Sequence, residues 1–150
     1  MFEYYKPNQL LDTYKRGKHK GEVKHAWDCV VRAFSKAWGL SWTETAKNLF
    51  DYALAIQRIP DEEEVWRHNL FESGKKPYVI RDGKKRYLTV REVAKSTEFD
   101  NEKYILNCRN HLVCVGEGKY YDCWDSGDIA VRGIYRVKSC PSPHQRSYIV

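Results

Sequence analysis

The sequence contains no apolar run long enough to cross a membrane. Its longest uninterrupted apolar stretches have only a few residues, as in Leu112-Val113-Cys114-Val115, whereas a membrane-spanning helix needs about 20. The first residues, Met1 to Pro7, also lack the charged and then apolar pattern of a secretory signal. These absences predict a soluble, cytoplasmic protein that has no membrane partner.

The cysteines lack the features of a disulfide framework. Their number is odd, at five, and no Cys-x-x-Cys pair occurs. Small disulfide-stabilised domains are secreted and usually carry an even set of cysteines, so we expect reduced thiols here. The glycines likewise form no phosphate-binding loop, because no helix start follows Gly116, Gly118 or Gly127. We therefore expect no nucleotide or other cofactor.

What remains is the composition of a globular protein. Hydrophobic residues make up 42% and aromatic residues 14% of the 150 residues, which is enough to bury a core. We expect a single domain over residues 1–150, with an irregular basic leader over 1–25 and a loose tail over 138–150. The net charge is +6. Such an excess either keeps the surface solvated or attracts nucleic acid or an acidic partner.

The order of the expected elements indicates an α+β fold. Apolar residues at spacings of three, four and seven predict a helix over Cys29–Trp38, and capping and charge patterns predict further helices. Asp82-Gly83 between two strand patterns predicts a hairpin. The remaining helices are expected over about 42–57, 60–71 and 90–95, and the remaining strands over 104–107, 111–115, 119–124 and 131–137. Helices followed by strands predict N-terminal helices packed on a mostly antiparallel sheet.

Cys29 stands at the expected start of the first helix, directly after Asp28, which is a good N-cap residue. A helix start lowers the pKa of a thiol, because the unpaired N–H groups and the helix dipole favour the thiolate. Cys is also one of the residue types that are most often buried for packing alone. The position of Cys29 therefore suits a nucleophile and a core residue equally well.

A nucleophilic cysteine needs a histidine base and a third group that orients the imidazole. Among the histidines, His111 alone opens an apolar strand. A two-residue turn at Glu117-Gly118 would place Val113 opposite Asp122, so that Asp122 shares a sheet face with His111. Diagonal neighbours lie about 7–8 Å apart, within reach of these side chains. Asp122 is the expected orienting residue, and Asp125 is the reserve if a longer turn or a bulge intervenes.

This arrangement resembles the papain-like cysteine peptidase superfamily, especially its small bacterial and phage members. Asp28-Cys29-Val30-Val31-Arg32-Ala33 is similar to the Asp-Cys helix start of the bacteriocin-processing peptidases. Asp122-Cys123-Trp124 matches the spacing of the Asn-Ser-Trp of papain-type enzymes, and the stretch from Tyr104 to Asp125 resembles uncharacterised phage proteins. The likeness covers residues 25–137 in layout.

The resemblance implies a papain-like fold and thiol-dependent acyl transfer on a protein or peptide substrate. Cys29 would attack a carbonyl, His111 would take and return the proton, and Asp122 would hold the imidazole. Trp124 would shield the hydrogen bond between the histidine and the acid. The outcome of the reaction, whether cleavage, deamidation or transfer, stays open, as does the oligomeric state.

One position departs from the family pattern. Papain-like enzymes usually carry a Gln about six residues before the cysteine, where it donates a hydrogen bond to the oxyanion. Here that position is Val23. His25 is a substitute donor, and so is the backbone N–H of Cys29.

A metal site is the first competing interpretation. Cys108, His111, Cys114 and Cys123 carry side chains that bind zinc, but zinc needs its ligands to converge at about 2.0–2.3 Å. Residues three apart on a continuous strand point to opposite faces of the sheet. We therefore expect no metal.

The second competing interpretation is a binding protein. The basic patch formed by Arg81, Lys84, Lys85 and Arg86, beside Tyr78 and Tyr87, has the charge and the aromatic edges that bind nucleic acid. A catalytically inactive papain-like protein could equally bind a host protein, for example as an anti-defence factor in the cytoplasm of an infected cell.

Overall fold

The structure is a computed structural model of the whole chain, and it describes residues 1–8, 13–22, 28–59 and 62–140. It is an α+β fold built around a six-stranded sheet with strand order β1-β7-β6-β5-β8-β2. The strands of this sheet are β1 (Phe2–Tyr4), β2 (Leu70–Glu72), β5 (Tyr104–Cys108), β6 (His111–Gly116), β7 (Lys119–Asp122) and β8 (Val131–Val137). The pair β1 and β7 is parallel, and every other neighbouring pair is antiparallel.

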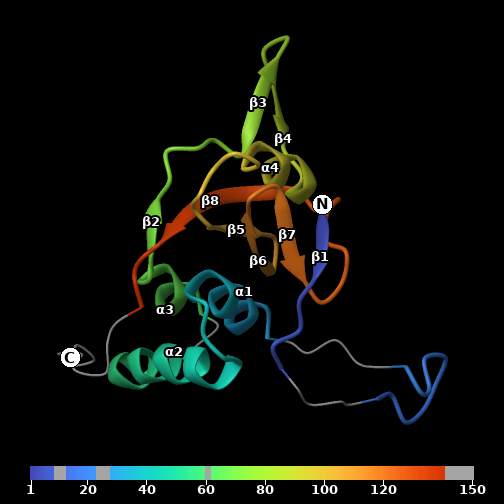
Figure 1. Cartoon of the computed structure of the whole chain (residues 1–150), viewed down its shortest axis with the longest axis vertical. Coiled ribbons are helices and arrows are strands. Elements are labelled where there is room, and N and C mark those ends of the chain that lie inside the picture. The colour runs from blue at the N-terminus through green and yellow to red at the C-terminus, as the bar shows by residue number, and fades with distance from the viewer. Residues whose placement is uncertain (9–12, 23–27, 60–61, 141–150) are drawn as a thin grey trace.

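Helices cover both faces of the sheet (Figure 1). The four helices are α1 (Cys29–Trp38), α2 (Trp42–Ile56), α3 (Glu63–Arg67) and α4 (Val90–Ser96). One core cluster joins α1 and α2 to sheet residues such as Ile105, Leu112 and Cys114. The other joins α4 to their neighbours Leu106 and Val113 on the opposite face. Because side chains alternate along a strand, each central strand supplies both cores.

Two tight hairpins follow the sequence expectation. Glu117 and Gly118 both have positive φ, at 54° and 79°, which is the backbone of a two-residue turn that matches the twist of the strands. The turn sets the register of β6 on β7, with Val115 opposite Tyr120 as expected. Asp82-Gly83 forms the same kind of turn between β3 (Tyr78–Arg81) and β4 (Lys84–Tyr87). This second hairpin projects from the body of the protein (Figure 1).

Two of the expected elements, the irregular leader over 1–25 and the helix over 60–71, are wrong in part. Residues 1–25 are not wholly irregular, because Phe2–Tyr4 forms β1 and pairs with β7 at the edge of the sheet. The helix expected over 60–71 ends at Arg67 instead, and Leu70–Glu72 pairs with β8 at the other edge. Both segments gain backbone hydrogen bonds from a sheet edge that local sequence patterns do not reveal.

The structure also bears on the expected C-terminal tail and on the expected absence of a membrane-spanning helix. Most of the tail expected over 138–150 lies outside the described residues. Within the described ranges, every helix is too short or too polar to serve as a membrane span.

Candidate active site

Cys29 is the first residue of α1 and is partly buried. Asp28 occupies the N-cap position, but its side chain makes no capping hydrogen bond, contrary to the expectation from the sequence. Its carboxylate instead accepts hydrogen bonds from Arg32 Nη1 at 2.5 Å and from Trp42 Nε1 at 2.7 Å. The side chain of Asp28 therefore does not cap the free N–H groups in the first turn of α1.

His111 is brought to both of the partners that the sequence suggested. Its Nε2 lies 2.7 Å from Oδ2 of Asp122, and the two side chains are 10% and 0% exposed. The imidazole also interacts with the Cys29 thiol, and the two groups shift each other's pKa. Since Nε2 is used by Asp122, Nδ1 is left for the sulfur. The histidine thus bridges the first residue of α1 and the last residue of β7.

The pKa values of Cys29 and His111 are shifted in opposite directions from their ordinary values. Burial alone would raise the pKa of the Cys29 thiol, but hydrogen bonds from His111 and the Leu112 N–H, together with nearby positive charge, bring it below its ordinary value. Burial would lower the pKa of His111, yet its bonds to Asp122 and Cys29 raise it to about 9. Each group therefore favours the charged form of the other, a thiolate beside an imidazolium.

Asp122 is fully buried and accepts hydrogen bonds from several groups besides His111. Arg32 Nη2 lies 3.0 Å from Oδ1, the Cys123 N–H donates to Oδ1 at 2.8 Å, and Ser126 Oγ donates to Oδ2 at 2.7 Å. Burial opposes ionisation of this carboxyl group. The hydrogen bonds from His111 and Ser126 and the positive charge of Arg32 outweigh the effect of burial and lower the pKa of Asp122. The carboxylate is held in one orientation and in its charged form.

Arg32 and Ser126 complete this arrangement and were not selected from the sequence. The Arg32 side chain is only 4% exposed and bridges Asp28 and Asp122. One signal could have revealed it, because an arginine four residues after Asp28 and within the apolar run of α1 must find a buried acidic partner. Ser126 follows the end of β7 in an irregular segment, and its sequence neighbours carry no comparable signal.

Trp124 lies against the imidazole. The centroids of the Trp124 and His111 rings are 5.2 Å apart, with an angle of 43° between the ring planes. The indole is 36% exposed, so one side faces solvent while the other covers His111. This is the position that the papain-type spacing implied for it.

The structure does not bring Asp125 to His111. Asp125 accepts hydrogen bonds from the Tyr120 hydroxyl at 2.5 Å and from the Gly127 N–H at 3.0 Å. The reason is that β7 ends at Asp122, after which the chain bends away from the line of the strand. Asp125 was the reserve for a hairpin with a longer turn or a bulge. The β6–β7 pairing contains neither. His25 and Val23 lie outside the described residues.

A cleft of about 600 Å³ opens at the Cys29 thiol. Its walls include Cys29, Trp66, Asn107, Asn110, His111 and Leu112. The cleft lies where the start of α1 meets the ends of β5 and β6, so a ligand in it would contact the sulfur and the imidazole together.

The buried cysteines of the strands differ from Cys29. Burial raises the pKa of both Cys108 and Cys114 to about 12, so neither forms a thiolate at neutral pH. Cys108 belongs to the core under α4 and Cys114 to the core under α1. In the part of the chain that the structure describes, no three histidine, cysteine or acidic side chains gather as metal ligands.

The basic patch lies on the projecting β3–β4 hairpin. Arg81, Lys84 and Lys85 are exposed, and the Lys85 ammonium lies 4.5 Å from the centroid of the Tyr78 ring. Arg86 differs, because its guanidinium forms two hydrogen bonds with Glu92 at 2.9 and 3.1 Å. Three of the four residues therefore present their charge to solvent, on an element separate from the Cys29 cleft.

Comparison with known proteins identifies no relative. No family model matches the chain, and neither a curated protein nor a solved structure matches it.

Proposed function

We propose that the protein is a papain-like thiol-dependent hydrolase or acyltransferase that acts on a protein or peptide in the cytoplasm, the host cytoplasm if the chain is phage-encoded. The observation that carries the proposal is the placement of His111, which interacts with the Cys29 thiol on one side and lies 2.7 Å from the Asp122 carboxylate on the other. A thiol at a helix start, a histidine that opens a strand and an acid on the next strand form the arrangement that such chemistry requires.

The proposed reaction is acyl transfer through a thioester. The Cys29 thiolate attacks a carbonyl carbon, and the Nδ1–H of the His111 imidazolium protonates the leaving group as its bond to that carbon breaks. The neutral imidazole then takes a proton from water or another nucleophile, which attacks the thioester and releases Cys29. Asp122 keeps the imidazole in place through Nε2 in both steps.

The oxyanion of each tetrahedral intermediate needs hydrogen-bond donors. The backbone N–H of Cys29 is one candidate, because it belongs to the uncapped first turn of α1. We assign His25 as the second candidate on the family resemblance.

The test is the rate at which iodoacetamide alkylates each cysteine between pH 4 and 9, followed by peptide mass spectrometry. We expect Cys29 to react rapidly at pH 6, and His111→Ala to slow it there by about tenfold or more, since the thiolate fraction of an ordinary thiol falls tenfold per pH unit below its pKa. Cys140, which is partly buried and distant in sequence, is the internal comparison. A Cys29 that reacts no faster than Cys140 in both proteins would sink the proposal.

The projecting hairpin favours a second candidate function, a catalytically inactive binding protein that contacts nucleic acid or a host protein. Its basic side chains are all exposed, and three of them, Arg81, Lys84 and Lys85, lie outside the Arg86–Glu92 ion pair and are separate from the cleft. Nucleic-acid binding would weaken steeply as salt is added and would be lost in Arg81→Gln/Lys84→Gln/Lys85→Gln, while Cys29→Ser would keep it. The reverse pattern, function lost in Cys29→Ser alone, belongs to the enzyme.

A further inference from the structure

The cleft beside Cys29 carries an excess of positive charge. Three of its lining residues are charged: Glu63, Arg109 and Arg132. Glu63 is already paired, because Arg67 Nη2 lies 2.6 Å from its carboxylate. Among the described residues, no ion pair is recorded for Arg109 or Arg132. The two guanidinium groups are thus available to a ligand that enters the cleft.

The backbone places both arginines at this point. Arg109 lies in the turn between β5 and β6, beside Asn110, whose φ is 55°. Arg132 lies in a bulge of β8, because Asn107 pairs with Gly133 and the next residue, Cys108, pairs with Val131. The extra residue in a bulge leaves the regular alternation of the strand, and bulges are frequent beside active sites for that reason.

The residue next to the bulge supports its shape. A Cβ at Gly133 would lie 2.8 Å from the Tyr135 ring, a distance that side chains do not tolerate. Only glycine fits there without a shift of the aromatic ring. The glycine beside Arg132 therefore lets the bulged strand pack closely against the Tyr135 ring.

From this placement we infer that the cleft selects a substrate with a carboxylate close to the reacting carbonyl, supplied by an acidic side chain or by the end of a peptide chain. The inference rests on the proposed function, since it names the substrate class for Cys29. A planar guanidinium binds a carboxylate with two parallel hydrogen bonds, and this is the anion that two arginines in a peptide-sized cleft fit best.

The probe is a matched pair of alkylating agents. Iodoacetate carries a carboxylate and iodoacetamide does not; with both, the Cys29 sulfur displaces iodide and forms a carbon–sulfur bond. The quantity measured is the ratio of the iodoacetate rate to the iodoacetamide rate at Cys29, which cancels differences in thiol reactivity. We expect Arg109→Gln/Arg132→Gln to lower this ratio about tenfold, since two charged hydrogen-bond donors are lost.

Arg16→Gln is the control. Arg16 is exposed in the leader and does not line the cleft, so its replacement removes a positive charge without changing the cleft. It should leave the ratio unchanged. An iodoacetamide rate that is high while the ratio does not respond to the two arginines overturns the carboxylate inference and keeps the reactive thiol. A Cys29 inert to both agents overturns the proposed function itself.

Two pairs of peptides then separate the sources of the carboxylate, with protection of Cys29 from iodoacetamide as the readout. The first pair is a peptide nitrile ending in glutamate and the same nitrile ending in glutamine. The second is a short peptide with a free carboxyl terminus and its amide. Preference for the glutamate nitrile assigns an acidic side chain, and preference for the free terminus assigns a chain end. Equal protection within both pairs overturns the inference.

Discussion

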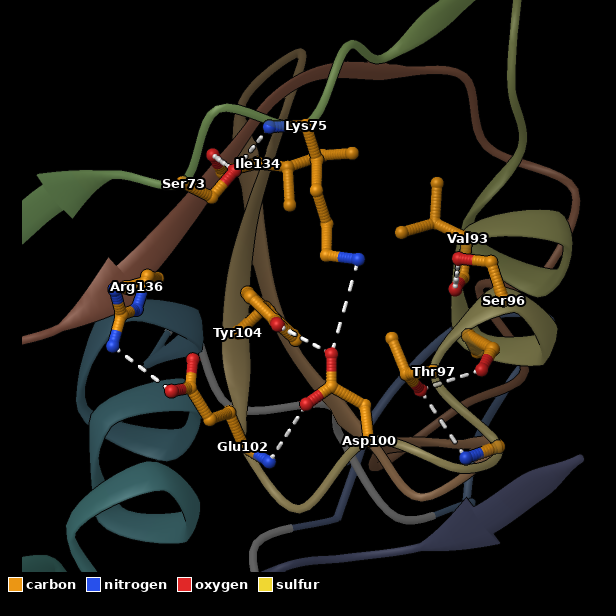
Figure 2. A network of polar contacts seen from close by, with 12 residues as sticks. Ser73, Lys75, Val93, Ser96, Thr97, Asp100, Glu102, Tyr104, Ile134 and Arg136 are labelled. Atoms are coloured by element: carbon orange, nitrogen blue, oxygen red, sulfur yellow. Dashed lines mark hydrogen bonds and ion pairs between the residues drawn. The ribbon is translucent and has the colours of Figure 1, made fainter.

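Two polar networks, one beside His111 and the other beside Tyr104 at the other end of the β5–β6 pair, use the same chemistry in different surroundings. In the first, Asp122 faces Arg32 and His111, with side chains 0%, 4% and 10% exposed. In the second, Asp100 accepts a hydrogen bond from the Tyr104 hydroxyl at 2.5 Å and lies 3.8 Å from Lys75 Nζ (Figure 2). Solvent reaches the second network, where the Asp100 and Lys75 side chains are 27% and 38% exposed.

The burial of each network determines how much it contributes to the stability of the fold. Exposed ion pairs are screened by water and contribute little to stability, so the Asp100 network needs no explanation beyond a well-solvated loop before β5. A buried ion network costs desolvation energy and is often no better for stability than apolar packing. One member of this network, His111, lines the Cys29 cleft, which is where the proposed chemistry requires it.

The largest expected effect comes from removing the carboxylate of the buried network. Asp122→Ala leaves the Arg32 guanidinium with Asp28 alone and His111 without its acceptor, and it should lower the free energy of unfolding by about 3–5 kcal/mol. Urea unfolding followed by tryptophan fluorescence measures this. Asp122→Asn keeps an acceptor and should lose less, and Asp100→Ala should lose only a small fraction of the Asp122→Ala effect. Equal losses at Asp122 and Asp100 would contradict the comparison.

A smaller effect measures the coupling between the two buried charges. Arg32→Met leaves Asp122 with His111, and Asp122→Ala leaves Arg32 with Asp28, so each single variant breaks the ion pair and keeps one of its charges buried. The double variant removes both charges. The double variant should therefore be more stable than the sum of the single losses by about 1–3 kcal/mol. Additivity within about 0.5 kcal/mol would show that the pair acts independently. Glu102 and Arg136 form an exposed ion pair with 2.9 Å between Oε1 and Nη2, and this pair is drawn in Figure 2. Glu102→Ala, Arg136→Ala and their double variant provide the matched cycle.

The pH dependence of stability follows from the raised pKa of His111. Because the folded pKa is about 9 and the unfolded value about 6.5, the folded state binds this proton more tightly. The stabilisation is fully present below pH 6.5 and is lost as pH rises toward 9. The lowered pKa of Cys29 works in the opposite direction, so the measurement belongs in the Cys29→Ala background, where Asp122 still bonds to His111.

In that background, Cys29→Ala should be more stable than Cys29→Ala/His111→Asn at pH 6. The difference should shrink between pH 6.5 and 9 by about 1.4 kcal/mol for each unit by which the His111 pKa remains raised. Urea unfolding at a series of pH values follows it. A difference that stays constant, or that grows with pH, would contradict the raised pKa.

The smallest expected effect lies in the exposed network. Arg136→Ala breaks the pair with Glu102, whose partners are 53% and 47% exposed, and it should change the free energy of unfolding by less than about 1 kcal/mol. The change should shrink further in 0.5 M salt, because salt screens exposed charges. A loss as large as that of Asp122→Ala would mean that exposure does not separate the two networks.

Local patterns were sufficient to predict much of the site. The helix start at Cys29 and the turn at Glu117-Gly118 are both written in short stretches of sequence. The turn fixes the register of β6 on β7, and the register in turn places Asp122 within reach of His111. The turn thus predicted the contact between His111 and Asp122, whereas the role of Trp124 was implied by the resemblance to papain-type enzymes.

Contacts that depend on distant segments could not be predicted in the same way. The ion pair between Arg32 and Asp122 joins a helix to a strand far along the chain, and only the packed structure shows it. The bulge at Arg132 arises from pairing with β5, and no local signal marks it. The edge strands β1 and β2 are each three residues long, too short for a period-two pattern to be distinguished from chance.

The parallel pairing of β1 with β7 has a consequence for how the protein is made. Tyr4 pairs with Asp122, and the Tyr5 N–H donates to the Asp122 carbonyl at 2.7 Å. A ribosome delivers the β1 segment well before the β7 segment. The β1 segment must therefore wait, without this strand partner, until β7 has been synthesised. The strand that carries Asp122 gains this neighbour only then, so a half-made chain holds Cys29 but no assembled site.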